Sequence, residues 1–414
     1  MTQTSRMVPN EPPVFQKRDL NGILIHCFNI NASDITIKTD ECIFVEIHGK
    51  LFRITNKRLT KSEVQAFISE LTGGEATISH LNSGEFHDCS YAIKENRSRT
   101  LRFRVNVVAI LSDGDIGYEI TIRTILSKPP DIKQMKIEKN LIDNVAPSKG
   151  MVLVTGATGS GKSTLLASII RMLLEQEEGN RKIITYENPI EFVYDEVDKP
   201  SSIITQSEVP KNIKNFAEAL KSALRRKPSV ILIGEMRDKE TISEGVIASM
   251  TGHLLYSTLH SNGVADTIRR MVGIFPTDEK NAAATDILSS LKMVIGQMLL
   301  PGVDGKRVAI REYLVFNEDI VDTLFKAGVD NLALETRKVL KKYGKSFLDD
   351  AKEKYDEGLI SLFEYNRVKS ISESQDKDLE LSTHKDEKNV LVKVEKIEEL
   401  GNNDENIDSF FKIE

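Results

Sequence analysis

The sequence has no tryptophan, only three cysteines and no long apolar stretch, and each shortage narrows what the protein can be. A membrane-spanning helix needs about eighteen consecutive apolar residues, so none is expected. No basic segment followed by an apolar one opens the chain, so we expect no secretion signal. Cys27, Cys42 and Cys89 show neither CxxC nor metal-ligand spacing. This argues against a disulfide framework and a zinc centre, and it favours reduced thiols in a cytosolic protein.

Acidic residues outnumber basic ones, and the excess lies near the carboxyl end. The whole chain carries a net charge of −6, whereas residues 371–414 hold six lysines against thirteen aspartates and glutamates, a net of −7. The other residues are therefore close to neutral and give no electrostatic case for direct nucleic-acid binding. The segment 371–414 is charged with few aromatics, so we expect an acidic, disordered tail.

The rest of the chain divides at a short segment that contains two adjacent prolines. We expect a stiff linker there, at 127–134, because proline keeps the segment from joining either flanking element. A mobile leader at 1–15 and an N-terminal domain at 16–126 precede this linker. A second domain follows it, at 135–370.

Antiparallel strands and two helices are predicted for the N-terminal domain. Apolar residues at helical spacing predict a helix within 16–30. Thr60 and Glu63 have the spacing of a capping box and predict the start of a second helix. Pairs of strands with short turns between them, as at 41–47 and 51–54, indicate an antiparallel sheet, so this domain is expected to be α+β.

In the second domain, short apolar strands alternate with helices. The strands are predicted at 151–155, 182–186, 229–233 and 254–258. Such alternation predicts a parallel sheet that is covered by helices, which is an α/β fold. The segments beyond it are predicted to be helical, at 277–299, 317–327, 333–343, 346–356 and 360–368.

Residues 156–163 fit the pattern G-x-x-x-x-G-K-[ST] at every fixed position, between a predicted strand and a predicted helix. In this context, the backbone N–H groups of the loop and the positive end of the helix dipole surround an anion. Lys162 would reach the β- and γ-phosphates of a nucleotide, and the Ser163 hydroxyl would ligate Mg²⁺. The residues expected to bind nucleotide here are Thr158, Gly159, Ser160, Gly161, Lys162, Ser163 and Thr164.

Acidic residues follow two other strands of the predicted parallel sheet, at the strand ends where such sheets bind ligands. Glu187 and Glu191 come after the second strand, and both are candidates to polarise an attacking water. A surface carboxylate that only caps the loop is the alternative for either one. Glu235 follows the third strand and is a candidate to hold Mg²⁺ or its water, although Gly234 stands where an aspartate would complete the usual acidic pair.

Two histidines bracket the fourth strand. His260 is a candidate catalytic group that responds to the γ-phosphate, and His253 is a candidate nucleotide contact. A structural role in the fold is the alternative for each. Arg270, on the segment that follows, is also a candidate for nucleotide binding.

Three arginines lie on two predicted strands of the N-terminal domain. Arg102 and Arg104 are two residues apart and therefore point to one face of their strand, and Arg123 lies on the next strand. In a ring of subunits, this face could meet a neighbour's nucleotide, with Arg104 and Arg123 as catalytic arginine fingers and Arg102 as a nucleotide contact. A solvated sheet face is the alternative.

Together these motifs resemble those of the secretion-ATPase superfamily: type II secretion and type IV pilus motors and their type IV secretion relatives. Residues 156–164 match its Walker A motif, 184–192 its Asp box, 231–238 its Walker B motif and 251–260 its His box. Its two arginine-bearing strands are matched by 102–106 and 122–125. Asn188 stands where the Asp box usually has aspartate. Within this superfamily the chain most resembles the DotB/TraJ group of type IVB secretion and IncI-type conjugation, at 192–196, 206–210, 223–228 and 308–316.

The resemblance implies a RecA-like P-loop NTPase domain with a parallel sheet and a helical C-terminal extension, preceded by a smaller, PAS-like α+β domain. It implies a cytoplasmic, Mg²⁺-dependent ATPase that forms a homohexamer and docks on an inner-membrane secretion or conjugation complex. Glu191 would then activate water, Glu235 would assist Mg²⁺ or water, and an arginine would reach the nucleotide. The alternative is a nucleotide-gated docking module with negligible turnover, which Gly234 and Asn188 favour.

Overall fold

A computed structural model describes residues 6–47, 49–95, 100–125 and 128–374. The chain forms two compact units, of which the first draws on 1–138 and 163–235 and the second on 139–162 and 236–414. Most of the predicted acidic tail, from 375 onward, lies outside the described residues, as do 1–5 of the leader and 126–127 at the linker. Within the described ranges, every helix is too short or too polar to cross a bilayer.

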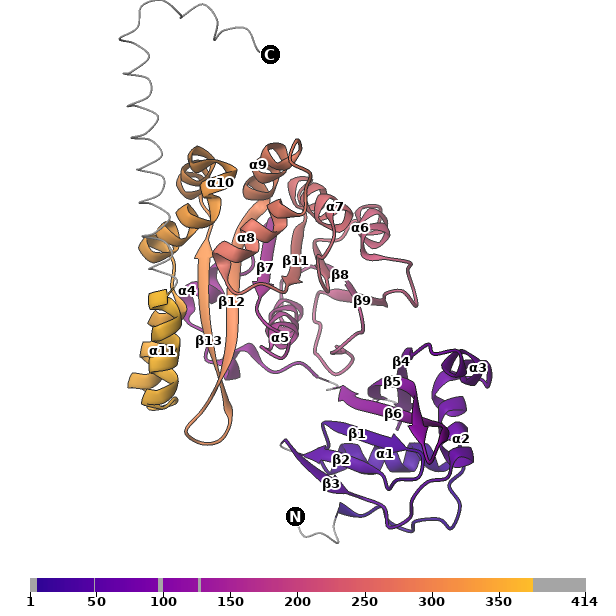
Figure 1. Cartoon of the computed structure of the whole chain (residues 1–414). Coiled ribbons are helices and arrows are strands. Elements are labelled where there is room, and N and C mark those ends of the chain that lie inside the picture. Colours follow the sequence, from indigo (N-terminus) through magenta and orange to yellow (C-terminus); the bar gives the residue numbers. More distant parts are fainter. Residues whose placement is uncertain (1–5, 48, 96–99, 126–127, 375–414) are drawn as a thin grey trace, which may run out of the picture. The chain divides into compact units, whose positions relative to one another are not determined.

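The first unit contains a six-stranded antiparallel sheet with the strand order β3-β2-β1-β6-β5-β4 (Figure 1). Its strands are β1 (Asp34–Lys38), β2 (Phe44–Ile47), β3 (Lys50–Arg53), β4 (His87–Lys94), β5 (Thr100–Ser112) and β6 (Asp115–Ile125). Three helices accompany it: α1 (Asp19–Asn29), α2 (Lys61–Thr72) and α3 (Ala76–Asn82). This is the predicted α+β arrangement.

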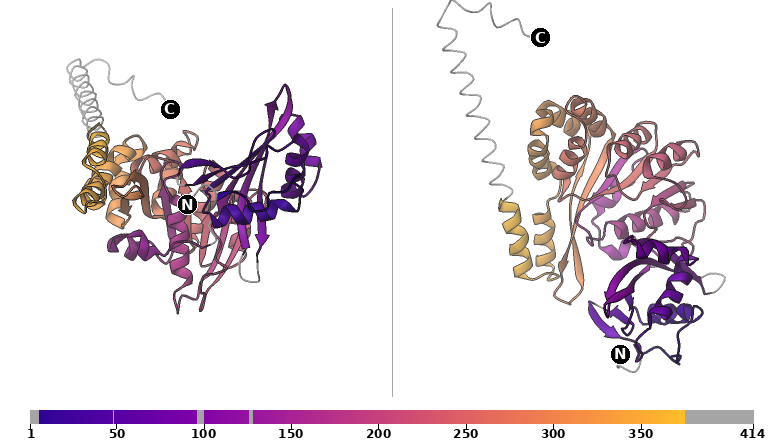
Figure 2. Two further views of the ribbon diagram at one scale, coloured as in Figure 1. Left: turned by 90° about the horizontal axis from the view of Figure 1, so that it is seen from below. Right: turned by 45° about the vertical axis from the view of Figure 1, so that its right-hand side comes forward.

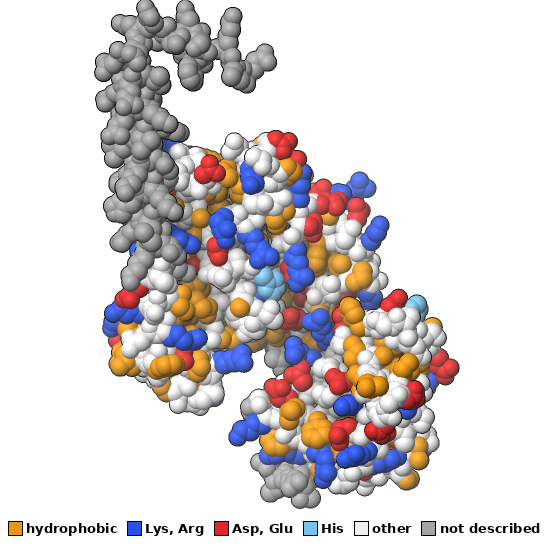
Figure 3. Space-filling model, viewed as in Figure 1, with side chains coloured by type: hydrophobic (Ala, Val, Ile, Leu, Met, Phe, Trp, Pro, Cys, Tyr) orange, Lys and Arg blue, Asp and Glu red, His pale blue; other side chains and the backbone are white. Residues whose placement is uncertain are grey.

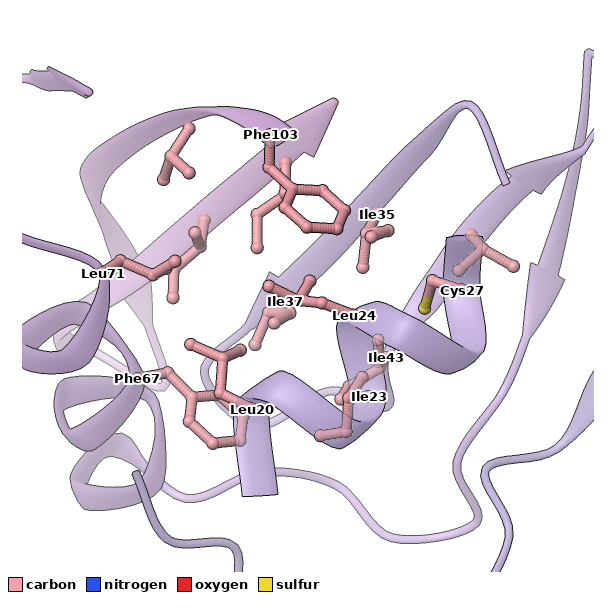
Figure 4. Packing of buried hydrophobic residues seen from close by; sticks show 14 of the residues in the cluster. Leu20, Ile23, Leu24, Cys27, Ile35, Ile37, Ile43, Phe67, Leu71 and Phe103 are labelled. Carbon is pink, nitrogen blue, oxygen red and sulfur yellow. The ribbon is translucent and has the colours of Figure 1, made fainter. Parts of the chain in front are cut away.

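One face of this sheet is apolar and packs on the helices. Figure 4 shows Leu24 of α1 beside Ile37 of β1 and Leu20 of α1 beside Phe67 of α2, in one apolar cluster with Ile35 of β1 and Phe103 of β5. Every second residue at the start of β5 is buried, as expected when one face of a strand meets the core. The other face is left for polar and charged side chains.

The capping box predicted for α2 is confirmed. The Thr60 hydroxyl accepts a hydrogen bond from the Glu63 N–H at 3.4 Å, and the Glu63 carboxylate accepts one from the Thr60 N–H at 2.8 Å. These two bonds satisfy donors that the first turn of a helix otherwise leaves without partners. The helix ends at Thr72, and Gly73 follows it in a left-handed conformation that suits glycine.

A seven-stranded sheet has the order β13-β12-β7-β11-β10-β8-β9. Its strands are β7 (Gly150–Thr155), β8 (Lys182–Glu187), β9 (Ile203–Glu208), β10 (Val230–Ile233), β11 (Leu254–Leu259), β12 (Leu291–Pro301) and β13 (Arg307–Val315). The pairs β7–β11, β7–β12, β8–β10 and β8–β9 are parallel, and β12–β13 is antiparallel. The predicted α/β fold of a P-loop NTPase is confirmed.

Helices flank these strands in both views of Figure 2. They are α4 (Lys139–Asn144), α5 (Lys162–Leu174), α6 (Phe216–Leu224), α7 (Lys239–Met250), α8 (Val264–Gly273) and α9 (Lys280–Ser290). In the second unit, α7 packs against β7 and β11, and α8 packs against β12. Strands with helices on their faces are buried on both sides, which explains why all of β7 and β11 is buried.

The prediction of one helix over 277–299 is wrong in its second half. The helix α9 ends at Ser290, and the chain continues as β12, which pairs with β7 on one side and β13 on the other. Most of β12 is buried, because it lies inside the sheet. A continuous apolar run is common to buried strands and buried helices, so periodicity does not separate them.

A helical C-terminal segment follows the hairpin of β12 and β13, as predicted. The helices expected at 317–327 and 333–343 form α10 (Glu318–Tyr343), with a break at Gly328, where φ is +73°. Beyond it, α11 (Phe347–Asp356) packs against β13, and residues 362–374 are also helical (Figure 1).

Candidate active site

The glycine loop of the second unit joins the buried strand β7 to the start of α5. Its conformation requires glycine at two positions that lie next to Gln297 of β12. Gly161 has φ +83°, and a Cβ there would lie 2.9 Å from the Gln297 side-chain nitrogen. At Gly156, a Cβ would lie 2.3 Å from the Gln297 carbonyl oxygen. The two loop glycines are therefore needed for close approach of the backbone to β12.

Lys162 is buried and faces its own loop. Its ammonium donates hydrogen bonds to the carbonyl oxygens of Gly156 at 2.8 Å and Ala157 at 3.0 Å. Ser160, close by in the loop, is 5% exposed. Its hydroxyl has no hydrogen-bond partner among the described residues. A buried hydroxyl without a partner is costly, which fits a loop whose polar groups are completed by a bound anion.

The residues after β11 lie beside the start of this loop. Thr155, the last residue of β7, shares hydrogen bonds with Ser261 at 2.5 Å and with the Leu259 carbonyl at 3.2 Å. His260 lies between these two partners and is half-buried. Arg270 of α8 donates to the carbonyl oxygen of His260. The structure therefore brings His260 and Arg270 to the same strand ends as the loop.

His253 lies at the other end of β11. The carbonyl of His253 accepts a hydrogen bond from Gly150, the first residue of β7, whereas the loop follows the last residue of that strand. Five residues of strand, about 17 Å, separate the two ends. The His253 ring contacts the carbonyl oxygen of Ala248 and the hydroxyl of Thr251, at 3.1 and 3.3 Å. The structure does not bring His253 to the loop.

Two of the candidate carboxylates come together in the first unit. Glu187 ends β8 and Glu235 follows β10, and these strands are parallel neighbours. The Gly234 N–H donates to the carbonyl of Tyr186 at 2.8 Å, so the residues next to each glutamate are hydrogen-bonded. The sequence predicted this proximity from the rule that ligand-binding groups collect at strand ends.

Burial raises the pKa of Glu187 to about 7. Hydrogen bonds from Thr185 at 2.6 Å and Gln206 at 3.2 Å act in the opposite direction, and the charge of Glu191 raises the pKa further. Gln206 also donates to the carbonyl of Phe192 at 2.8 Å. It therefore ties the loop that carries Glu191 to the strand that carries Glu187, while Glu191 itself is exposed.

The three arginines share the polar face of the antiparallel sheet, as predicted. Arg104 and Arg123 are direct partners across β5 and β6, and both are exposed. Arg123 pairs with Asp34 at 2.8 Å. Arg102 is half-buried, and its Nε is buried with no hydrogen-bond partner among the described residues. Two arginines directly opposite one another repel, although Asp34 reduces the repulsion at Arg123, and this arrangement fits a face that meets an anion.

The structure places the remaining candidates as follows. Thr158 and Gly159 are exposed at the tip of the loop, and Ser163 and Thr164 are half-buried in the first turn of α5. The sequence did not indicate Gln206 or Gln297 as site residues, and Gln206 is only part of the resemblance at 206–210. For Gln297, one polar side chain within the otherwise apolar run 293–300 was an available signal, but the assignment of that run to a helix concealed it.

Comparisons with known proteins cover most of the chain. A family model described as "Type II/IV secretion system protein" matches residues 13–307. A twitching motility protein of Neisseria gonorrhoeae is 38% identical over 275 residues, which are 66% of this chain and 70% of that protein. The solved structure of the Legionella pneumophila ATPase DotB matches with a TM-score of 0.80 and 44% sequence identity. The match covers 88% of this chain and 99% of that one. The pilus retraction motor PilT with bound ADP is 30% identical, with a TM-score of 0.71 and coverage of 84% and 95%.

Proposed function

Because the chain is an ATPase of the type II/IV secretion system protein family, we propose that it works as a hexameric ring that converts Mg²⁺-dependent ATP hydrolysis into movement between its domains. We propose that it acts in a type IVB secretion or conjugation machine and docks, from the cytoplasm, on the proteins of an inner-membrane complex. The moving parts would be the N-terminal domain at 16–126 and the ATPase domain at 135–370, with the linker 127–134 as the hinge.

The conformation of the glycine loop is the observation that carries the proposal. It holds a buried ammonium, a buried hydroxyl that lacks a hydrogen-bond partner among the residues described, and a backbone that only glycine permits. When a nucleotide binds, its phosphate oxygens replace the carbonyl oxygens of Gly156 and Ala157 as hydrogen-bond acceptors of the Lys162 ammonium. The helix α5, which begins at Lys162, adds the positive end of its dipole.

Ser163 and Glu235 are the residues that would hold Mg²⁺ or its water, and the oxygen ligands of a hydroxyl and a carboxylate suit this ion. When bound, Mg²⁺ would neutralise negative charge on the β- and γ-phosphates. Among the protein groups, we assign the activation of water to Glu191, on its exposed loop beside Glu187. Burial raises the pKa of the neighbouring Glu187 to about 7, and the charge of Glu191 raises it further, so Glu187 can hold a proton near neutral pH.

Arg104 and Arg123, with Arg102 beside them, would reach the nucleotide of a neighbouring subunit. The buried Arg102 Nε, which has no hydrogen-bond partner in the part of the chain that the structure describes, supports this role, as does the position of Arg104 directly opposite Arg123. Basic and acidic side chains are mixed on the face seen in Figure 3, a pattern that suits protein partners better than a nucleic acid.

Phosphate release from ATP and Mg²⁺ by the purified full chain tests the proposal. Lys162→Ala is expected to abolish turnover, and Glu191→Gln is expected to abolish turnover while ATP still binds. Lys352→Ala, which removes an exposed ammonium paired with Asp356 on α11, is the matched control and should keep full activity. Full activity of Lys162→Ala would refute the assignment, and a wild type no faster than this variant would show a docking module in place of a motor.

A mixing experiment tests the arginines. Loss of an arginine finger lowers turnover about 10³-fold or more. Arg104→Ala and Lys162→Ala subunits are each expected to be inactive alone. Mixed rings should recover turnover, because some interfaces then combine an intact loop with an intact arginine of the neighbour. Mixtures that stay inactive, although size measurements show mixed hexamers, would place Arg104 outside the active site.

A further inference from the structure

We infer that Gln297 and Arg311 are positioning residues of the nucleotide site, and that they fix the direction of the peptide between Ser160 and Gly161. This inference rests on the proposed function, because it gives both residues a role in phosphate binding. Neither residue belongs to the nucleotide-site motifs, although Arg311 lies in the stretch 308–316 that carries part of the family resemblance.

Three hydrogen-bonded groups form a buried path from β13 to the loop. The Gln297 side-chain nitrogen donates to the Ser160 carbonyl oxygen at 2.8 Å. The Arg311 Nε donates to the Gln297 side-chain oxygen at 2.8 Å. Gln297 is 1% exposed and Arg311 4%. Such groups leave water at a cost, and their mutual hydrogen bonds offset part of it.

The sheet places these side chains together. Gln297 and Arg311 are direct partners in the antiparallel pairing of β12 with β13, so their side chains lie on one face. The parallel pairing of β12 with β7 sets Gly296 opposite Thr155, the residue before the loop. The contact of Gln297 with the loop therefore follows from the pairing of β12 with β7 and β13.

Arg311 decides which end of the Gln297 amide faces the loop. A guanidinium has only donors, so it must meet the amide oxygen, and the amide NH₂ is then left to face Ser160. If the amide turned over, its oxygen would face the Ser160 carbonyl oxygen and neither could donate. Arg311 therefore acts on the loop through Gln297.

Gln297 in turn directs an N–H group of the loop. The carbonyl of Ser160 and the N–H of Gly161 belong to one trans peptide and point in opposite directions. When Gln297 holds the carbonyl toward β12, the Gly161 N–H points away from β12 and is free to donate to a phosphate. The N–H groups of such loops cradle the α- and β-phosphates, so ATP and ADP should depend on this peptide alike.

The test measures the Kd of the full chain for a fluorescent ADP analogue and the KM for ATP. Gln297→Met removes the donor with little change in volume and should raise both at least tenfold, with kcat nearly unchanged. Gln297→Glu keeps the shape but cannot donate when ionised, and it should show the same loss. Asp350→Asn is the matched control: its carboxylate accepts from the Arg311 backbone N–H at 2.7 Å, outside the path, so affinity should not change.

A double-mutant cycle separates positioning from general damage. Arg311→Met should weaken ADP binding severalfold in the wild type and hardly at all in Gln297→Met, because Arg311 acts through Gln297. Additive losses, or normal affinity of either Gln297 variant, would overturn the inference. If Gln297→Met does not fold, Gln297→Glu decides by the same criterion. A wild type that binds no nucleotide would instead refute the proposed function.

Discussion

Glu312 of β13 should make the stability of the second unit depend on pH. Its residue is 9% exposed, and its carboxylate accepts a hydrogen bond from the Val264 N–H, at the start of α8, at 2.6 Å. Burial raises the pKa of Glu312 from 4.5 to about 7, against the opposing effects of this hydrogen bond and of Arg337. Glu312→Gln removes the charge and keeps the shape and the acceptor.

The sign and size of the effect follow from proton binding. Between pH 4.5 and about 7 the native state holds a proton on Glu312 that the unfolded chain has lost, so the free energy of unfolding falls as pH rises. At 1.36 kcal/mol per pH unit, the loss reaches about 3 kcal/mol above pH 7. The free energy of unfolding of Glu312→Gln does not fall in this way. It should therefore be close to that of the wild type at pH 4.5 and higher at pH 8.

Thermal unfolding of the full chain at pH 5 and pH 8 measures the difference. For a unit of this size, about 3 kcal/mol corresponds to a Tm difference of roughly 6–12 °C. Glu279→Gln, at a half-buried glutamate whose side chain is 45% exposed, is the control and should shift the Tm equally at both pH values. The reasoning fails if the Tm difference between Glu312→Gln and wild type is the same at pH 5 and pH 8.

Three further changes test other parts of the molecule. The pH profile of ATP hydrolysis should change near pH 7 in the wild type and not in Glu187→Gln, because the pKa of Glu187 is about 7; a profile that keeps this change would assign it to another group. Gly161→Ala should weaken ADP binding at least tenfold, whereas Gly305→Ala, equally strained at φ +78° but in open space, should leave affinity intact; equal affinities would contradict the contact with Gln297. Thr60→Ala should cost about 1 kcal/mol of local stability, seen as faster hydrogen exchange in α2; unchanged exchange would mean that the capping box contributes little.

Much of the fold could be predicted from the sequence where local and long-range preferences agree. The glycine loop is one case, because a short apolar strand, a fixed glycine pattern and a helix follow one another and each supports the others. The capping box at Thr60 is another, because its hydrogen bonds join residues three positions apart. In both, the residues that determine the conformation are neighbours in the chain.

The strand β12 could not be predicted in the same way. Its residues have apolar side chains on both faces, and only pairing with β7 and β13 makes the segment a strand. Gln297 depends on that pairing, since its partner Ser160 is 137 positions away in the sequence. Likewise, His253 and His260 look equivalent in the sequence, and the register of β11 against β7 is what separates them.

The two hydrogen bonds from Lys162 to carbonyl oxygens affect which ligands the loop can bind. A ligand must offer the ammonium more than the oxygens of Gly156 and Ala157 already do, since those bonds are broken when it enters. A single small anion meets the ammonium alone, whereas a chain of phosphates replaces both contacts and also reaches the backbone amides of the loop. The resting loop thereby favours long polyanions over the free phosphate that hydrolysis leaves behind.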